Sequence, residues 1–92
     1  MPEVTIRSFA KLREKLGEIN KISVADGVSV YEAIERFAEN NSAAKEELFS
    51  PEGLKTYIIL MFNRERIDID DAKEMKISDG DEIVLYPPVS GG

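Results

Sequence analysis

The sequence predicts an α+β fold in which one long helix crosses one face of a mixed sheet of about five strands. Three observations lead to this prediction. Two short segments near the start alternate apolar and polar residues, a long amphipathic helix follows them, and an apolar segment rich in strand-forming residues comes later. Because a single helix shields only one face of a sheet, we expect the opposite face to be open.

The N-terminal part predicts two strands separated by a short helix. Residues 4–9 alternate apolar and polar side chains, which places Phe9 on the more polar face. Residues 10–16 favour a short helix that ends at Gly17. Residues 19–24 alternate again and are typical of a half-buried second strand.

A capping box starts the long helix. The Ser29 hydroxyl can serve an unpaired amide of the first turn, while Glu32 reaches back to the Ser29 amide. The helix then carries one apolar stripe at helical spacing, formed by Val30, Ala33, Ile34, Phe37 and Ala38. Ser42 is expected to cap a second, short helix over residues 43–49, and residues 50–55 are expected to form an exposed loop.

The C-terminal half predicts the remaining strands. Residues 57–62 are apolar throughout, so we expect them to form the central strand. Residues 66–69 can pair back on them, and residues 70–76 are expected to be irregular. The last strand, residues 82–86, stops before a proline, which lacks the amide hydrogen that strand pairing needs. This element order is the β-grasp layout, in which the first and last strands pair in parallel.

The strand at residues 57–62 is apolar on both faces, which predicts an open apolar patch. If Ile58, Leu60 and Phe62 pack on the helix, the residues between them point outward. Alternate residues of the last strand would then point outward too. We expect four residues to be substantially exposed and to bind a partner: Ile59, Met61, Val84 and Tyr86. The alternative is that a loop or the short helix shields some of them.

Composition excludes most kinds of catalytic centre. The chain has 92 residues, of which 42% are hydrophobic and 33% charged, so it has room for one modest core. It has no cysteine and no histidine, so thiolate chemistry, disulfides and the usual general base are excluded. The carboxylates between Asp68 and Glu74 lack the spacing of an EF-hand and suggest a solvated loop. No metal or bound cofactor is expected.

Charge and hydropathy limit the partners. The net charge of −6 disfavours nucleic acid, because phosphate contact needs a basic face. The negative charge is explained either by solubility or by steering toward a basic partner surface. The start of the sequence lacks the pattern of a signal peptide, and no apolar run approaches the roughly 20 residues that span a bilayer. We therefore expect a cytoplasmic protein that does not bind membranes.

The sequence ends in two glycines. Residues without side chains can thread a narrow channel and deliver a bare carboxylate, and two prolines before them should stiffen the exit from the domain. We expect a domain over residues 1–86 and a flexible tail over residues 87–92. The tail residues are Pro87, Pro88, Val89, Ser90, Gly91 and Gly92. The alternative is a frayed terminus without a role.

These features together resemble one family, the small subunit of molybdopterin synthase and the archaeal small ubiquitin-like modifier proteins. The resemblance covers nearly the whole chain, although the middle, residues 40–55, is longer than in the shortest carriers. It rests on Phe9-Ala10-Lys11-Leu12-Arg13-Glu14, Asn63, Asp79-Gly80-Asp81-Glu82-Ile83 and the terminal hexapeptide Pro87-Pro88-Val89-Ser90-Gly91-Gly92.

The resemblance implies a carrier that is not itself an enzyme. An activating enzyme of the ubiquitin type would use ATP and magnesium to adenylate the Gly92 carboxylate. A sulfur donor would then form a thiocarboxylate for a dithiolene precursor or a tRNA base, or a lysine of a target protein would form an isopeptide bond. The implied partners are that enzyme and either a molybdopterin synthase large subunit or lysine-bearing proteins. The alternative is a β-grasp interaction module whose tail is never activated.

Overall fold

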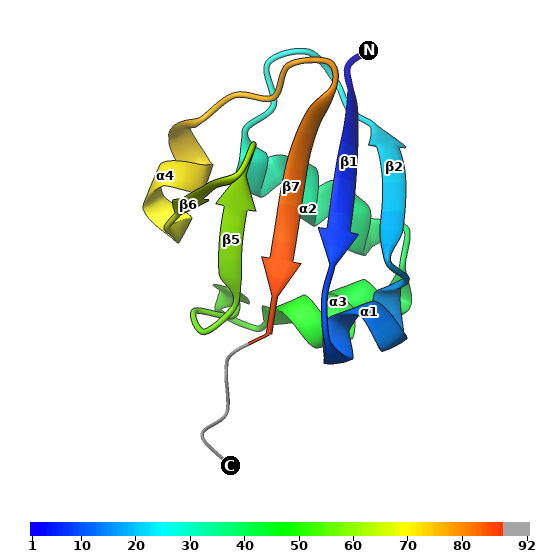
Figure 1. Cartoon of the computed structure of the whole chain (residues 1–92). Helices are drawn as coiled ribbons and strands as arrows, with labels where there is room; N and C mark the ends of the chain where they lie inside the picture. The colour runs from blue at the N-terminus through cyan, green and yellow to red at the C-terminus, as the bar shows by residue number, and fades with distance from the viewer. Residues whose placement is uncertain (88–92) are drawn as a thin grey trace.

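The computed structural model describes residues 1–87 and shows a five-stranded sheet with helix α2 across one face (Figure 1). The strands stand in the order β2-β1-β7-β5-β6. Their bounds are Glu3–Ser8 for β1, Ile19–Ser23 for β2, Ile59–Phe62 for β5, Glu65–Ile67 for β6 and Asp81–Tyr86 for β7. The helices are α1 (Lys11–Leu16), α2 (Val30–Glu39), α3 (Ser42–Leu48) and α4 (Ile69–Glu74), and a separate ribbon consists of β3 (Phe49–Ser50) and β4 (Gly53–Leu54). The predicted α+β class is confirmed.

The middle of the sheet is the parallel pair of β1 and β7, as expected from the β-grasp order. The central strand is β7, however, so the prediction that residues 57–62 are central is wrong. Within that segment β5 begins only at Ile59, and it lies between β7 and the short edge strand β6. The reason is that apolar residues on both faces of a strand predict that the strand is buried. They do not predict which strands lie on either side of it.

The core lies between the sheet and α2. The predicted capping box is present, because Ser29 Oγ accepts a hydrogen bond from Glu32 N at 3.1 Å and Glu32 Oε1 accepts one from Ser29 N at 2.9 Å. All five residues of the predicted stripe are buried, and Phe37 is only 3% exposed. The residues predicted to face the helix, Ile58, Leu60 and Phe62, are buried in the same cluster.

Residues 49–54 form the ribbon β3–β4, so the prediction of an exposed loop at residues 50–55 is wrong. Leu54 is buried, and its N–H donates a hydrogen bond to Tyr31 Oη at 3.0 Å. Gly53 has a positive φ of 121°, and a Cβ there would stand 2.8 Å from Tyr31 Oη. A tertiary contact with α2 therefore organises this segment, and the local pattern could not show that contact.

Two other local predictions are corrected. Helix α3 begins at Ser42 because Asn41, one residue earlier than expected, is the cap: Asn41 Oδ1 accepts a hydrogen bond from Ala44 N at 3.1 Å. The stretch predicted to be irregular contains α4. Asp68 caps this helix by accepting a hydrogen bond from Asp71 N at 2.7 Å, and Ala72 is fully buried. The two caps are Asn41 and Asp68, and both residue types also favour turns.

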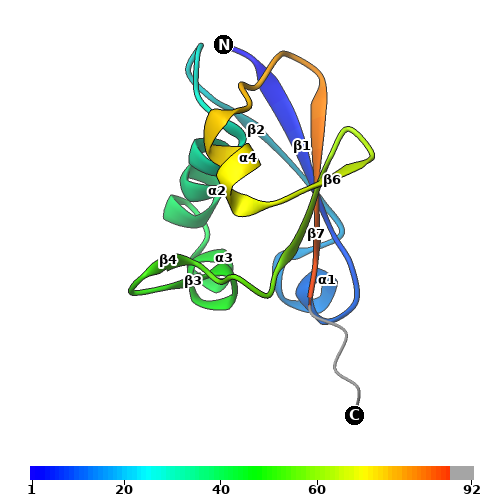
Figure 2. The same ribbon diagram turned by 90° about the vertical axis from the view of Figure 1, so that its left-hand side faces the viewer.

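Figure 2 shows the sheet nearly edge-on, with α2, α3 and α4 on one side of it. Among the elements within residues 1–87, no helix crosses the other face. We call this other face the outer face. None of the helices in the described part of the chain is long and apolar enough to cross a membrane.

Candidate functional site

The outer face carries an apolar patch over β5 and β7. The antiparallel register places Ile59 opposite Tyr86 and Met61 opposite Val84. These four side chains are absent from the buried core cluster, as expected for residues that alternate with core residues along each strand. Their predicted placement on the face away from α2 is therefore confirmed.

The prediction that these four residues are substantially exposed overestimates the exposure of all of them. Ile59, Met61 and Tyr86 are half-buried. Val84 is 6% exposed, so the prediction that it is substantially exposed is wrong. The cause is its central position, since β7 is flanked by Arg7 of β1 on one side and Met61 of β5 on the other. Val84 thus forms the floor of the patch rather than its rim.

Phe9 extends the patch and was not among the predicted partner-binding residues. Its ring stacks on that of Tyr86, with centroids 4.9 Å apart and planes 10° from parallel. Stacked aromatic pairs of this kind are typical anchors of protein interfaces. The alternation of β1 does place Phe9 on the outer face, but only the parallel pairing of β1 with β7 brings it to Tyr86. We define the outer patch as Phe9, Ile59, Met61, Val84 and Tyr86.

The outer patch lies where the chain leaves the sheet. Strand β7 ends at Tyr86, as predicted from the proline that follows, and Pro87 is half-buried. The other predicted tail residues lie outside the described residues: Pro88, Val89, Ser90, Gly91 and Gly92. A partner that covers Tyr86 would therefore stand next to the start of the tail.

Asn63 and the Asp79–Asp81 turn fix the strands that carry the patch. Asn63 Nδ2 donates to Asp81 Oδ1 at 3.0 Å, and Asn63 Oδ1 accepts from Glu82 N at 2.9 Å. Asp79 Oδ1 accepts from Glu3 N at 2.7 Å, which ties the same turn to β1. Asn63 tolerates its positive φ of 48° because asparagine adopts the left-handed region more readily than most residues. These motif residues therefore set the strand register, and with it the geometry of the outer patch.

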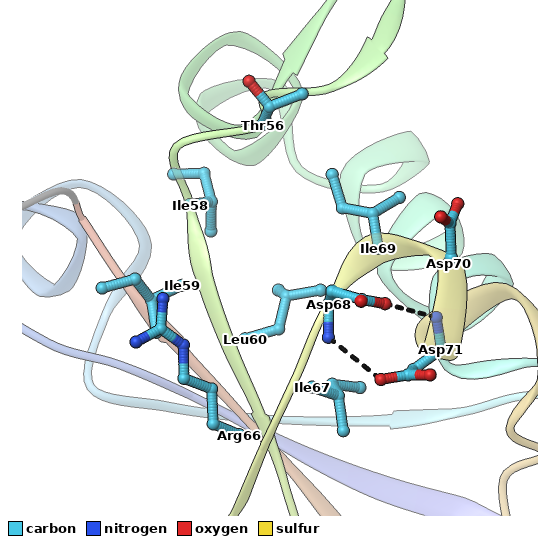
Figure 3. Close-up of a pocket in the computed structure, with 10 residues that line it drawn as sticks. All are labelled: Thr56, Ile58, Ile59, Leu60, Arg66, Ile67, Asp68, Ile69, Asp70 and Asp71. Atoms are coloured by element: carbon cyan, nitrogen blue, oxygen red, sulfur yellow. Dashed lines mark hydrogen bonds between the residues drawn. The ribbon is translucent and has the colours of Figure 1, made fainter.

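A groove of about 590 Å³ lies between β5 and α4, and Figure 3 shows the residues that line it. Its floor is apolar, with Ile58, Leu60 and Ile67 all buried. Two of its carboxylates, Asp68 and Asp71, cap α4 through the hydrogen bonds drawn in the figure. Within residues 1–87, no group of three or more acidic, histidine or cysteine side chains is arranged to hold a metal ion. The groove offers no set of residues for catalysis.

Glu32 is a carboxyl group whose pKa the fold alters, and its role is structural. The pKa of Glu32 is lowered, chiefly because its carboxylate accepts a hydrogen bond from the Ser29 backbone amide and secondly through the Ser29 side chain. This group caps α2 and is far from the outer patch in sequence and in the fold. Among the described residues, the outer patch is the candidate binding surface.

A search against family models matches residues 6–92 to the ThiS family. Among solved structures, SAMP1 from Haloferax volcanii is 28% identical, with a TM-score of 0.85 and coverage of 98% of this chain and 99% of that chain. Small archaeal modifier protein 1 from Methanosarcina acetivorans is 30% identical, with a TM-score of 0.83 and coverage of 100% and 98%.

A third match is to the protein–protein complex of subunits 1 and 2 of the molybdopterin-converting factor from Helicobacter pylori. The matched chain is 26% identical, with a TM-score of 0.64 and coverage of 98% of this chain and 99% of that chain. No curated protein sequence matches at a significant level. The resemblance predicted from the sequence motifs, and the ubiquitin-like β-grasp fold that it implies, are confirmed.

Proposed function

The chain belongs to the ThiS family, and we propose that it is a ubiquitin-like carrier that an adenylating enzyme activates at the Gly92 carboxylate. The family and the matched structures support a sulfur carrier or protein modifier that is not itself a catalyst. The finer proposal concerns the chemistry. It takes Gly92 as the C-terminal residue, with Gly91 giving access to an activating site that a side chain would obstruct.

Activation needs no tuned side chain. An α-carboxyl group with a pKa of about 3.3–3.7 is ionised at neutral pH, so its oxygen can attack the α-phosphate of ATP while pyrophosphate leaves. ATP and magnesium belong to the enzyme in this scheme. A sulfur nucleophile then displaces AMP to give a thiocarboxylate, or a lysine amine displaces it to give an isopeptide bond. Each second step breaks the bond between the acyl carbon and the oxygen that links it to phosphorus, so AMP leaves with one of the original carboxylate oxygens.

The observation that carries the proposal is the outer patch beside the exit of the tail. An extended chain covers at most about 3.3–3.6 Å per residue, so the six residues 87–92 reach roughly 20 Å from the sheet. A partner that holds Phe9, Met61 and Tyr86 can therefore receive the carboxylate in an active site within that distance. Docking on the patch fixes the domain, and the tail delivers the reacting group.

The partners we propose are an adenylating enzyme and the proteins that use the activated carrier. One matched structure is a complex of two molybdopterin-converting factor subunits, which supports a large-subunit partner. Two others are small archaeal modifier proteins, which supports lysine-bearing targets. We also propose a cytoplasmic location. No nucleic acid or membrane is part of the proposal.

Intact mass spectrometry of the protein purified from its own cells tests this function. A thiocarboxylate replaces one oxygen by sulfur and shifts the mass by the difference between those atoms, whereas an isopeptide adduct joins the chain to a larger protein through Gly92. The matched control is the chain without Gly91 and Gly92, which should show neither product. If the full chain is recovered only with an unmodified terminus and without adducts, the alternative of an interaction module replaces the carrier.

A further inference from the structure

An arginine flanks the outer patch on each side. The registers of β1, β7, β5 and β6 place Arg7 opposite Val84, Val84 opposite Met61, and Met61 opposite Arg66. These four residues form one row across the outer face, with two apolar side chains between two guanidinium groups. Neighbouring strands lie about 4.8 Å apart, so three strand spacings separate the arginine backbones by roughly 14 Å.

Arg7 has hydrogen-bonding capacity to spare. Its Nε lies 3.2 Å from Glu82 Oε2, but the two are not aligned for a hydrogen bond, and Nε is buried without a hydrogen-bond partner in residues 1–87. Glu82 therefore orients the Arg7 guanidinium without accepting hydrogen bonds from its N–H groups. The side chain is 43% exposed, which leaves the outer end of the guanidinium open to a partner.

Arg66 is exposed on the edge strand β6. The register places Arg66 opposite Met61, a residue of the outer patch. Figure 3 shows the Arg66 guanidinium on the opposite side of β5 from the carboxylates of Asp70 and Asp71. The ion pairs found in the described part of the chain do not include it. An arginine that faces an apolar patch instead of nearby acids on its own chain is placed to meet a charge on another molecule.

We propose that the partner surface that docks on the outer patch carries carboxylates on both sides of an apolar contact, so that Arg7 and Arg66 each meet an acidic side chain. This inference rests on the proposed function, because the partner is the adenylating enzyme. The local charge of the row is opposite to the net charge of −6. The two arginines thus fix how the partner is positioned on the outer patch. The net negative charge of the protein repels other acidic surfaces that lack a matching apolar contact.

Charge reversal in ATP–pyrophosphate exchange with the cognate adenylating enzyme tests the proposal. The Arg7→Glu, Arg66→Glu double variant should raise KM for the carrier about tenfold or more, because each reversed charge now opposes a carboxylate. The kcat at saturation should be unchanged, since docking is lost equally from the ground state and the transition state. The KM of the wild-type protein should also rise with salt, which screens these pairs.

Three controls keep the outcome interpretable. Arg36→Glu changes the same charge on α2 and should leave KM unchanged, and Arg66→Lys should retain most of the affinity. If Arg7→Glu disturbs folding because it lies beside Glu82, the single variant Arg66→Glu, on an exposed edge strand, replaces the double variant. Arg66→Glu alone should raise KM several-fold. If wild-type KM persists in the reversed variants, or falls, the proposed acidic rim is wrong. If the wild-type protein supports no exchange at all, the proposed function fails and this inference fails with it.

Discussion

The two faces of the sheet bury apolar side chains to different depths. On the face under α2, Ile6, Leu60 and Ile83 are at most 1% exposed. On the outer face, Ile59 and Met61 are half-buried, and arginines stand beside them. The inner face therefore contributes most to folding stability. The outer face leaves part of an apolar patch in contact with solvent, which is typical of a surface that binds a partner.

The largest effect should come from the inner face. Replacing Phe37 by Ala removes a ring that is 3% exposed, and should lower the free energy of unfolding by about 3–5 kcal/mol through lost transfer energy and a cavity. That is a large part of the roughly 5–15 kcal/mol that stabilises a typical domain. Urea denaturation measures it. Tyr57→Ala, at a residue 52% exposed, is the control and should change little; similar losses in the two variants would contradict the assignment of the core.

The outer face should separate binding from stability. Met61→Glu places a charge in the middle of the outer patch and should weaken binding to the adenylating enzyme about tenfold or more, because desolvating a carboxylate in an apolar contact is costly. Its Tm should hardly change. Calorimetric titration and thermal melts measure the two effects. Ala25→Glu, in an exposed loop at the other end of the sheet, is the control. Parallel loss of stability and affinity in Met61→Glu would show that the patch is core.

A smaller effect is expected at the ribbon β3–β4. Gly53→Ala should destabilise the fold by about 1–2 kcal/mol, because alanine at a positive φ is strained and its Cβ would stand 2.8 Å from Tyr31 Oη. In a Tyr31→Phe background, which lacks that oxygen, the same substitution should cost less. A double-mutant cycle from denaturation curves measures the coupling. Equal costs in both backgrounds would mean that the Tyr31 hydroxyl does not restrict this position.

The smallest effect should be a dependence on pH at the capping box. The pKa of Glu32 is lowered from its ordinary 4.5, mainly by the hydrogen bond from the Ser29 backbone amide. The stability gained from the ionised cap is therefore complete above that value and is lost as pH falls through the lowered pKa. Glu32→Gln retains a cap without the charge, so its stability relative to wild type should improve in acid. A difference that stays constant with pH would contradict this role.

The sequence could predict the elements whose signals are local. The capping box at Ser29, the stripe through Phe37 and the strand end at Tyr86 depend on near neighbours along the chain, and the structure confirms them. The β-grasp element order predicted the parallel pairing in the middle of the sheet, which the structure confirms. Side chains alternate between the two faces of a strand, and this alternation correctly predicted that Ile59 and Met61 lie on the outer face.

Most of what the sequence could not predict concerns contacts between distant segments. The burial of Val84 follows from the central place of β7, which periodicity does not specify. The stacking of Phe9 on Tyr86 depends on the register of β1 against β7. Helix α4 escaped notice because it is short and begins with acidic residues that are equally common in turns. The first two cases needed the position of a strand that is remote in sequence, whereas the local signal for α4 was ambiguous.

ATP–pyrophosphate exchange tests the central claim most directly, with the cognate adenylating enzyme and two forms of the protein. The full chain should stimulate exchange, and the chain without Gly91 and Gly92 should not, although its Tm should match because no residue of the described core is removed. This result would place activation at the terminal carboxylate. Exchange that persists in the folded, truncated protein, or that never occurs with the full chain, would contradict the account.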